Sequence, residues 1–423
     1  MSLFALLRNS TVVVLPFLGA CRVPPALTGA SRPSCPATDA TSQAVASVPL
    51  PGRAFKAIPT SDGCWVFVSM NARPDGTGSG VAVVRRIADG GVLTRTIPGP
   101  PAIPRFGVPG AFGMGVTQDG NVLIVAALDR LSFYDVGRLT SGAGDPLLGT
   151  LPSVGEPSGF FSIGITADDR LLFATNHNDS VITIVDLAAT RRSAFNAVVI
   201  IGRIPVGYGP SGLAFSSDQH YLYATSQIAL AGWGWPNACK APGAGASAAP
   251  NHRRGALHVI DVARAVVDPS RSVVATVPAG CDPVRVVTST VDNRAYVTAR
   301  SDNVLLAFDT GRLISDSAHA LIGTVTTHTG PVGIALLGGG RRVVVTNSPR
   351  FAGSSTDTAM VTIVDANAIG TGRNATVTSV ALIAGPLELT PTRDGRTLLL
   401  TGFESQRLVF LNVTKAPFSE RAP

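Results

Sequence analysis

His177 is the side chain in this sequence best suited to acid–base chemistry, because histidine titrates near neutral pH and can act as a general base. Asp179 follows it two residues later and could orient the imidazole ring. Glu404 is a further carboxylate, in a different polar stretch, that could activate water. We therefore take His177, Asp179 and Glu404 as catalytic candidates, with an ordinary solvated loop residue as the alternative reading of each.

Other side chains are typical of binding sites. Trp233 and Trp235 form a Trp-Gly-Trp run, and loop aromatics of this kind either bind a sugar or peptide or pin their own loop to the protein. Guanidinium, carboxylate and amide groups that surround a single pocket could bind an anionic sugar, a lactone or a peptide. The residues that the sequence offers for this role are Arg285, Arg300, Asp302 and Asn347.

Familiar enzyme and cofactor motifs are absent from the sequence. It contains no G-x-S-x-G, H-E-x-x-H, P-loop, C-x-x-C, C-x-x-C-H or EF-hand-like string. We therefore expect no cofactor and no metal, and any catalytic site must be assembled from several parts of the chain. The net charge is +7, but the basic residues are scattered in ones and twos, whereas nucleic-acid binders concentrate them on one face. No nucleic-acid partner is indicated.

The N-terminus predicts export from the cytoplasm. Residues 1–20 combine one arginine, an apolar run and small residues, which is the pattern of a secretory signal. Leu18-Gly19-Ala20-Cys21 resembles a bacterial lipobox, so Cys21 is a predicted lipidation site, with ordinary cleavage after Ala20 as the alternative. Residues 21–42 lack periodicity and suit a flexible tether. We expect contact with the membrane only through this lipid anchor, with the protein in the periplasm or at the cell surface.

A unit of four short strands recurs seven times between residues 43 and 412. Clear copies begin at Pro157, Pro210, Pro283 and Pro331. The turn between the first two strands contains an aspartate in most units, at positions 62, 119, 168, 218, 292 and 394. Five of the third strands end in Asp135, Asp186, Asp261, Asp309 and Asp365, which we interpret as caps of the following loop rather than as a charge ring. Seven such units predict an all-β, seven-bladed β-propeller.

The two ends of the repeat series predict how the ring closes. The seventh unit stops after its third strand at Asn412, leaving a tail at residues 413–423. Residues 44–51 precede the first unit and match the fourth-strand pattern of the other units. Pairing this N-terminal strand with the last blade would remove an open sheet edge. We expect a monomer.

The repeat register also predicts two disulfides. Cys239 lies in an insertion at residues 227–255, between the second and third strands of the fourth unit, and Cys281 lies in the loop to the fifth unit. Both loops belong to the same face, so we expect Cys239 to pair with Cys281 in an oxidising compartment. The remaining pair is then Cys35 with Cys64, and the first bridge is expected to hold Trp233 and Trp235 over the channel mouth.

The repeats resemble YVTN-type propellers, which are related to bacterial lactonase-like propellers. The stretches that carry the resemblance are AYVTARSDNVLLAFD from Ala295, LFATNHNDSVITIVD from Leu172 and VVVTNS from Val343. The resemblance implies a ligand site on the channel face. Two functions follow: a binding or scaffold module for a small sugar-like ligand, a peptide or another envelope protein, or a lactone hydrolase like the 6-phosphogluconolactonase-type propellers. No residue of this chain can be matched to a catalytic residue of that family.

Overall fold

The computed structural model describes residues 44–88, 90–99, 110–152, 159–240, 248–351, 358–383 and 385–415. The predicted signal, Cys21, the tether and Cys35 lie outside these residues, as does most of the C-terminal tail. Among the residues described, no helix is long and apolar enough to cross a membrane.

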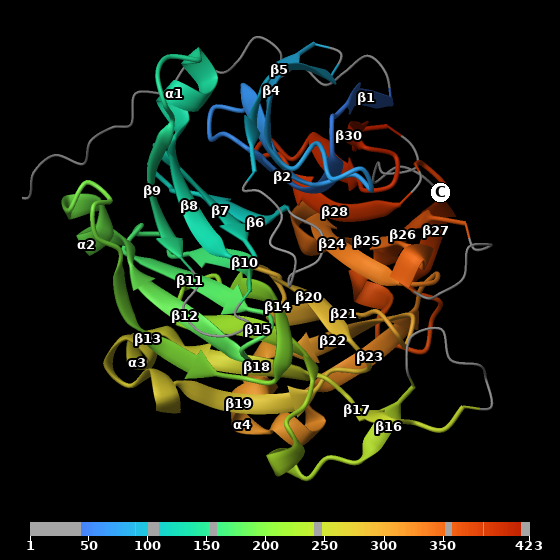
Figure 1. Cartoon of the computed structure of the whole chain (residues 1–423). Helices are drawn as coiled ribbons and strands as arrows, with labels where there is room; N and C mark the ends of the chain where they lie inside the picture. The colour runs from blue at the N-terminus through green and yellow to red at the C-terminus, as the bar shows by residue number, and fades with distance from the viewer. Residues whose placement is uncertain are drawn as a thin grey trace, which may run out of the picture. The chain divides into compact units, whose positions relative to one another are not determined.

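Seven four-stranded antiparallel sheets follow one another around a ring, which confirms the predicted propeller (Figure 1). Each blade has its first strand innermost, and the first strands of neighbouring blades contact one another around the whole ring. The first three blades are β2 (Arg53–Pro59), β3 (Trp65–Asn71), β4 (Gly80–Ile87) and β5 (Gly90–Pro98); β6 (Ala111–Val116), β7 (Val122–Ala127), β8 (Arg130–Asp135) and β9 (Leu147–Pro152); and β10 (Phe160–Ile165), β11 (Leu171–Asn176), β12 (Val181–Asp186) and β13 (Val199–Pro205).

The next three blades follow the same order along the chain. They are β14 (Tyr208–Phe215), β15 (Tyr221–Ile228), β18 (Ala256–Asp261) and β19 (Val273–Pro278); β20 (Pro283–Thr288), β21 (Arg294–Ala299), β22 (Val304–Asp309) and β23 (Leu321–Thr326); and β24 (Pro331–Leu337), β25 (Arg342–Asn347), β26 (Met360–Asp365) and β27 (Thr376–Val380).

The seventh blade is built from both ends of the described chain, as predicted. Its strands β28 (Pro386–Pro391), β29 (Thr397–Gly402) and β30 (Arg407–Asn412) are completed by β1 (Val45–Pro49). The pairing is antiparallel, from Val45 opposite Leu411 to Pro49 opposite Arg407. Val48 and Leu50 are buried in one apolar cluster with Phe410. The N-terminal strand therefore covers an edge and also fills part of the core.

The aspartates that end the third strands are caps, as the sequence predicts, but the segment that each one caps is a short helix or 3-10 turn rather than an irregular loop. The side chain of Asp135 accepts a hydrogen bond from the backbone N–H of Arg138, three residues on, and Asp186, Asp261 and Asp309 make the equivalent bond. Asp365 accepts instead from the N–H of Asn367, two residues on. Asx side chains satisfy the first unpaired N–H groups of a helix in this way. The short helices that they begin are α1 (Val136–Ser141), α2 (Leu187–Arg192), α3 (Val262–Val267), α4 (Thr310–Ser315) and the 3-10 turn η8 (Ala366–Ala368).

Buried hydroxyl groups of the second strands join neighbouring blades. The Thr346 hydroxyl accepts a hydrogen bond from Gly333 N–H at 2.7 Å within its own blade and donates to the Leu387 carbonyl of the next blade at 2.7 Å. Thr401 makes the same link from the seventh blade to the Phe55 carbonyl of the first, at 2.8 Å. Ser69 and Thr298 repeat this link between other blades. This is why serine or threonine stands in otherwise apolar strands such as VVVTN.

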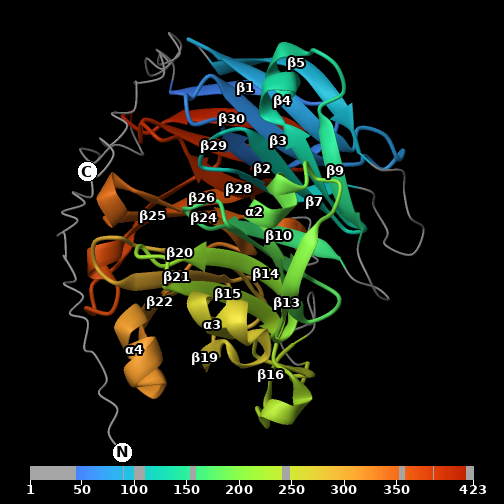
Figure 2. The same ribbon diagram turned by 90° about the vertical axis from the view of Figure 1, so that its left-hand side faces the viewer.

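The insertion in the fourth blade forms a small structure of its own at the edge of the ring (Figures 1 and 2). It contains the 3-10 turn η3 (Ala231–Trp233) and a two-stranded sheet of β16 (Asn237–Cys239) and β17 (His252–Arg253). A disulfide joins Cys239 to Cys281, with Cα atoms 5.6 Å apart, which confirms that predicted pair. The other pair, Cys35 with Cys64, stays a prediction because Cys35 lies outside the described residues.

Candidate functional site

A cavity of about 260 Å³ lies where the seven innermost strands meet. Every blade contributes at least one residue to its lining, so the cavity exists only in the closed ring. The lining consists of Phe55, Asn71, Phe112, Phe161, His177, Ser211, Gln227, Val284, Arg285, Arg300, Val332, Arg350, Leu387 and Phe403. We call this cavity the channel-mouth site.

The apolar part of the site is a ring of equivalent positions, one from each blade. We call it the central ring; it consists of Phe55, Phe112, Phe161, Ser211, Val284, Val332 and Leu387. In every blade a β-bulge interrupts the pairing of the first two strands at this position. A bulge re-aims a side chain that a regular strand would direct between the sheets. The rings of Phe55 and Phe112 meet edge to face at 5.2 Å, and that of Phe161 lies 5.4 Å from that of Phe112.

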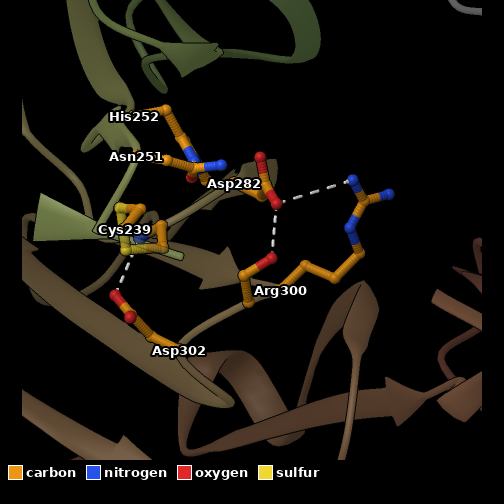
Figure 3. The surroundings of a disulfide bond; sticks show 8 residues. Cys239, Asn251, His252, Asp282, Arg300 and Asp302 are labelled. Atoms are coloured by element: carbon orange, nitrogen blue, oxygen red, sulfur yellow. Dashed lines mark hydrogen bonds and ion pairs between the residues drawn. A yellow bond between two sulfur atoms is a disulfide. The ribbon is translucent and has the colours of Figure 1, made fainter. Parts of the chain in front are cut away.

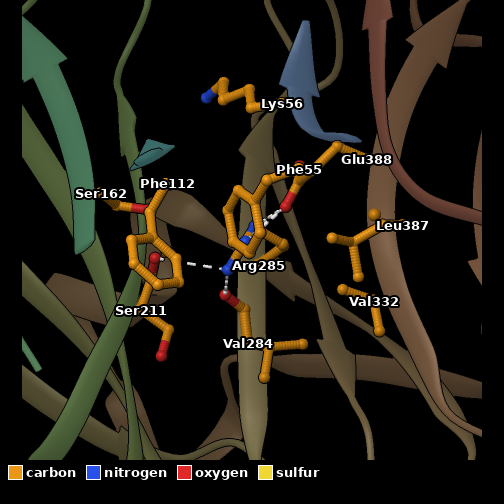
Figure 4. A network of polar contacts seen from close by, with 12 residues as sticks. Phe55, Lys56, Phe112, Ser162, Ser211, Val284, Arg285, Val332, Leu387 and Glu388 are labelled. Atoms are coloured by element: carbon orange, nitrogen blue, oxygen red, sulfur yellow. Dashed lines mark hydrogen bonds and ion pairs between the residues drawn. The ribbon is translucent and has the colours of Figure 1, made fainter. Parts of the chain in front are cut away.

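Arg285 directs its guanidinium across the centre of the ring (Figure 4). The group donates hydrogen bonds to the carboxylate of Glu388, in the seventh blade, and to the Ser211 carbonyl, in the fourth blade, at 3.4 Å. The Cζ atom of Arg285 lies 5.5 Å from the centre of the Phe161 ring. The side chains of Arg285 and Glu388 are only 12% and 7% exposed, so this is a buried ion pair. Pairing is what makes two charges tolerable at the centre of the protein.

Two further arginines stand at the site, each next to a carboxylate. The guanidinium of Arg300 lies 3.9 Å from the Asp282 carboxylate (Figure 3). The guanidinium of Arg350 lies 3.4 Å from the Glu404 carboxylate, and its carbon is 3.8 Å from the centre of the Phe403 ring. A guanidinium held against an aromatic face keeps its planar fork oriented for a ligand.

The lining of the channel-mouth site is cationic. Three guanidinium groups line it, whereas the balancing carboxylates of Glu388, Asp282 and Glu404 are outside the lining. Burial, with the nearby Arg285 charge, lowers the pKa of Arg300, although Asp282 opposes this. Burial, with the charges of Arg53 and Arg300, likewise lowers the pKa of Arg350 against the effect of Glu404. The cations therefore repel one another in a poorly solvated space, and an anion there would relieve the repulsion.

His177 lines the same cavity, in the loop between β11 and β12. Its ring lies 5.0 Å from the Phe161 ring, and it forms a hydrogen bond with the backbone of Pro210. Proline has no N–H, so the imidazole donates to the Pro210 carbonyl. Its Nδ1 atom is buried without a hydrogen-bond partner among the described residues. Burial, together with the charges of Arg300 and Arg285, lowers the pKa of His177, so the ring is neutral at pH 7.

The other predicted residues are spread more widely. Asp179 is not among the lining residues, and its N–H donates to the Asn176 carbonyl at 3.1 Å. Glu404 lies at the edge of the site, bound to Arg350 and 3.8 Å from Arg53. Asp302 accepts the Cys281 N–H at 2.7 Å and so holds a loop. Of these three residues, Glu404 forms an ion pair with a residue of the lining, Arg350.

Asn347 and the two tryptophans also lie outside the lining of the site. Asn347 is fully buried and donates to the Thr362 hydroxyl at 2.9 Å, within its own blade. The Trp233 ring lies 5.4 Å from the Trp235 ring and 5.6 Å from the ring of His258 in β18. These contacts favour the structural alternative, in which Trp233 packs the insertion against the fourth blade.

Sequence reasoning missed most of the site's apolar residues and one of its arginines. Phe55, Phe112 and Phe161 read as ordinary strand residues, although an alignment of the seven units would place them at one position. Arg350 stands in a loop with no distinguishing motif. Within the described residues, no group of three or more His, Cys, Asp or Glu side chains could hold a metal.

Comparisons with known proteins identify the architecture. No family model matches the chain, and no curated protein matches it. Among solved structures, it is similar to a chain of the Mitotic Checkpoint Complex, at 12% identity and a TM-score of 0.60, covering 96% of this chain and 99% of that one. It is also similar to Kuenenia stuttgartiensis hydrazine synthase, at 15% identity and a TM-score of 0.61, over 87% of this chain and 97% of that one. The β-propeller domain of Myceliophteria thermophila Cps50 (Swd1) matches at 11% identity and a TM-score of 0.59, over 87% and 98%. At these identities the likeness defines a seven-bladed β-propeller and nothing finer.

Proposed function

We propose that this protein is a binding module that takes a small organic anion into the channel-mouth site. The observation that carries the proposal is the lining: three guanidinium groups and a neutral imidazole, with no carboxylate among them. Arginine binds carboxylate and phosphate groups through two parallel hydrogen bonds, and such charge-assisted bonds are strong where water is scarce. A ligand therefore supplies the negative charge that the lining lacks.

The central ring adds a preference for the rest of the ligand. Six of its seven members are apolar, and Ser211 is the exception. An anion with an apolar or aromatic body can bury that body against these side chains while its acidic group meets Arg300 and Arg350. Burial of apolar surface contributes roughly 25 cal/mol per Å². A cavity of about 260 Å³ suits a small metabolite rather than a folded partner.

We place this module outside the cytoplasm. A disulfide persists in an oxidising compartment, and Cys239–Cys281 is such a bond. The signal-like residues 1–20 and the lipobox at Cys21 support the same location, and the resemblance to YVTN-type propellers supports a binding role. Replacing Cys21 by Ser is expected to move the protein from the membrane fraction to the soluble fraction. Equal membrane association of both forms would contradict the anchor.

Isothermal titration calorimetry with three named anions tests the binding proposal. The probes are benzoate, D-glucuronate and inorganic phosphate, at an ionic strength matched with sodium chloride. We expect benzoate to bind most tightly, and Arg350→Gln to weaken its binding at least tenfold. Arg271→Gln is the matched control, because it removes the same charge from a side chain that is 78% exposed. If none of the three anions produces binding heat or thermal stabilisation at millimolar concentration, the proposal fails.

Lactone hydrolysis is the second candidate function, and His177 is the observation in its favour. This imidazole lines the same cavity as three arginines, which could stabilise the oxyanion that forms when water attacks an ester carbonyl. Its lowered pKa, however, makes it a weak base. Hydrolysis of D-glucono-1,5-lactone above the spontaneous rate, lost in His177→Gln, would favour this candidate over simple binding.

A further inference from the structure

The Cys239–Cys281 bridge joins the fourth-blade insertion to the loop between β19 and β20. Cys239 and Cys281 are only 1% and 4% exposed. Exchange with a reductant requires access to a sulfur atom. This burial therefore identifies a permanent cross-link rather than a redox switch, and its purpose must be sought in the loop that it holds.

That loop contains a residue in an unfavourable conformation. Asp282 follows Cys281 and has a φ of 51°, in the left-handed region that non-glycine residues rarely adopt. Such a conformation is unfavourable and persists only where neighbouring contacts impose it. The bridge fixes the residue immediately before Asp282, so it is one of those contacts.

Three hydrogen bonds fix the same loop against the loop between β21 and β22. Cys281 N–H donates to the Asp302 carboxylate at 2.7 Å, and Ser301 N–H donates to the Cys281 carbonyl at 3.1 Å. Arg300 N–H donates to the Asp282 carbonyl at 3.0 Å. The two loops therefore move as one unit, which the disulfide ties to the insertion.

The carboxylate of Asp282 is held beside the Arg300 guanidinium by this arrangement. It accepts a hydrogen bond from the Ser301 hydroxyl and lies 3.9 Å from the Arg300 guanidinium (Figure 3). The side chains of Asp282 and Arg300 are 8% and 17% exposed, so solvent screens the attraction between their charges only weakly. Arg300 in turn lines the site. A chain of contacts thus runs from the insertion to a wall of the cavity.

We infer that the Cys239–Cys281 bridge and Asp282 are positioning elements that hold the Arg300 guanidinium at the channel-mouth site. Without the bridge, Asp282 relaxes toward negative φ, its carboxylate turns away, and Arg300 becomes mobile and more exposed. The effect on ligand affinity rests on the proposed function. The effect on Arg300 itself does not.

Chemical modification of arginine by phenylglyoxal, read by peptide mass spectrometry, tests the inference without any ligand. In Cys239→Ser/Cys281→Ser, we expect Arg300 to be modified at least three times faster than in the wild type. Arg350, held by Glu404 and Phe403 rather than by this loop, is the internal control and keeps its rate. Asp282→Asn retains the bridge and is expected to accelerate modification of Arg300 in the same way.

The outcomes separate this inference from the binding proposal. Unchanged modification of Arg300 in the double variant overturns the role of the bridge, and equal acceleration at Arg300 and Arg350 shows general loosening and overturns it too. If the double variant does not fold, Asp282→Asn provides the test. An unchanged modification rate of Arg300 in that variant also overturns the inference. Where the wild type binds benzoate, we expect both variants to bind it at least fivefold more weakly. Failure of benzoate to bind the wild type contradicts the proposed function and leaves the modification result standing.

Discussion

Arg285 and Glu388 lie 103 residues apart in the sequence, on the innermost strands of the fifth and seventh blades, and form a buried ion pair at the centre of the ring. The pair spans the sixth blade, whose innermost strand lies between them in the ring. It therefore contributes to the closed ring, and it holds the Arg285 guanidinium in the lining of the site.

Removing one member of this pair is expected to be costly. Glu388→Gln leaves the Arg285 guanidinium buried without its counter-charge, and the free energy of unfolding should fall by about 3 kcal/mol. Urea denaturation measures the change. The double variant Arg285→Met/Glu388→Gln removes both charges and should recover at least half of the loss. If the double variant is no more stable than Glu388→Gln, the pair is not a coupled unit.

The closing strand can be tested by truncation. A chain that begins at Pro51 lacks β1, exposes the edge of β30 and removes Val48 and Leu50 from the core, each of which contributes about 1.5–3 kcal/mol. We expect aggregation or a much lower melting temperature in scanning fluorimetry. A chain that begins at Gln43 keeps β1 and is the control. Equal melting temperatures for the two chains would show that β1 does not close the ring in solution.

The hydroxyl links between blades predict a cost for an isosteric substitution. Thr346→Val leaves the Gly333 N–H and the Leu387 carbonyl without their buried partner, which should lower the free energy of unfolding by about 1–3 kcal/mol. Thr324→Val, at an exposed position on the outer strand β23, changes the same atoms and should be nearly neutral. Chemical denaturation compares the two, and equal effects would argue against the link.

Acid should destabilise the protein through His258. Complete burial lowers the pKa of His258 from 6.5 to about 3. The unfolded chain therefore binds this proton more readily than the folded one, so stability is full above about pH 6.5 and is lost as the pH falls toward 3. The slope is about 1.4 kcal/mol per pH unit.

Urea unfolding at pH 7 and pH 5 measures this slope. The wild type should lose about 2 kcal/mol more than His258→Gln between the two values, given the unfolded pKa of 6.5. His319→Gln, at a side chain that is 77% exposed, is the control and should retain the wild-type slope. Identical losses in all three proteins would mean that His258 does not set the acid sensitivity.

The sequence alone determined the fold, because the relevant signals are local. Strand periodicity, the turn aspartates and the capping aspartates each act over a few residues, and the recurrence of the four-strand unit seven times specifies the propeller. The closing strand followed from a unit that lacks its fourth strand, and the Cys239–Cys281 pair followed from two loops on one face. These inferences needed only the register of the repeats.

The site was decided by the tertiary structure. The sequence pattern of a strand such as β25 does not show whether a polar residue at its end faces a cavity or a neighbouring strand. In the structure, Asn347 faces Thr362 of the neighbouring strand. Phe55 and Phe161 turn toward the axis only because a bulge interrupts each innermost strand. The meeting of Arg285, Arg300 and Arg350 depends on how seven blades converge. Side chains that are tens of residues apart in the sequence become neighbours only when the ring closes. No local sequence pattern predicts how close they come in space.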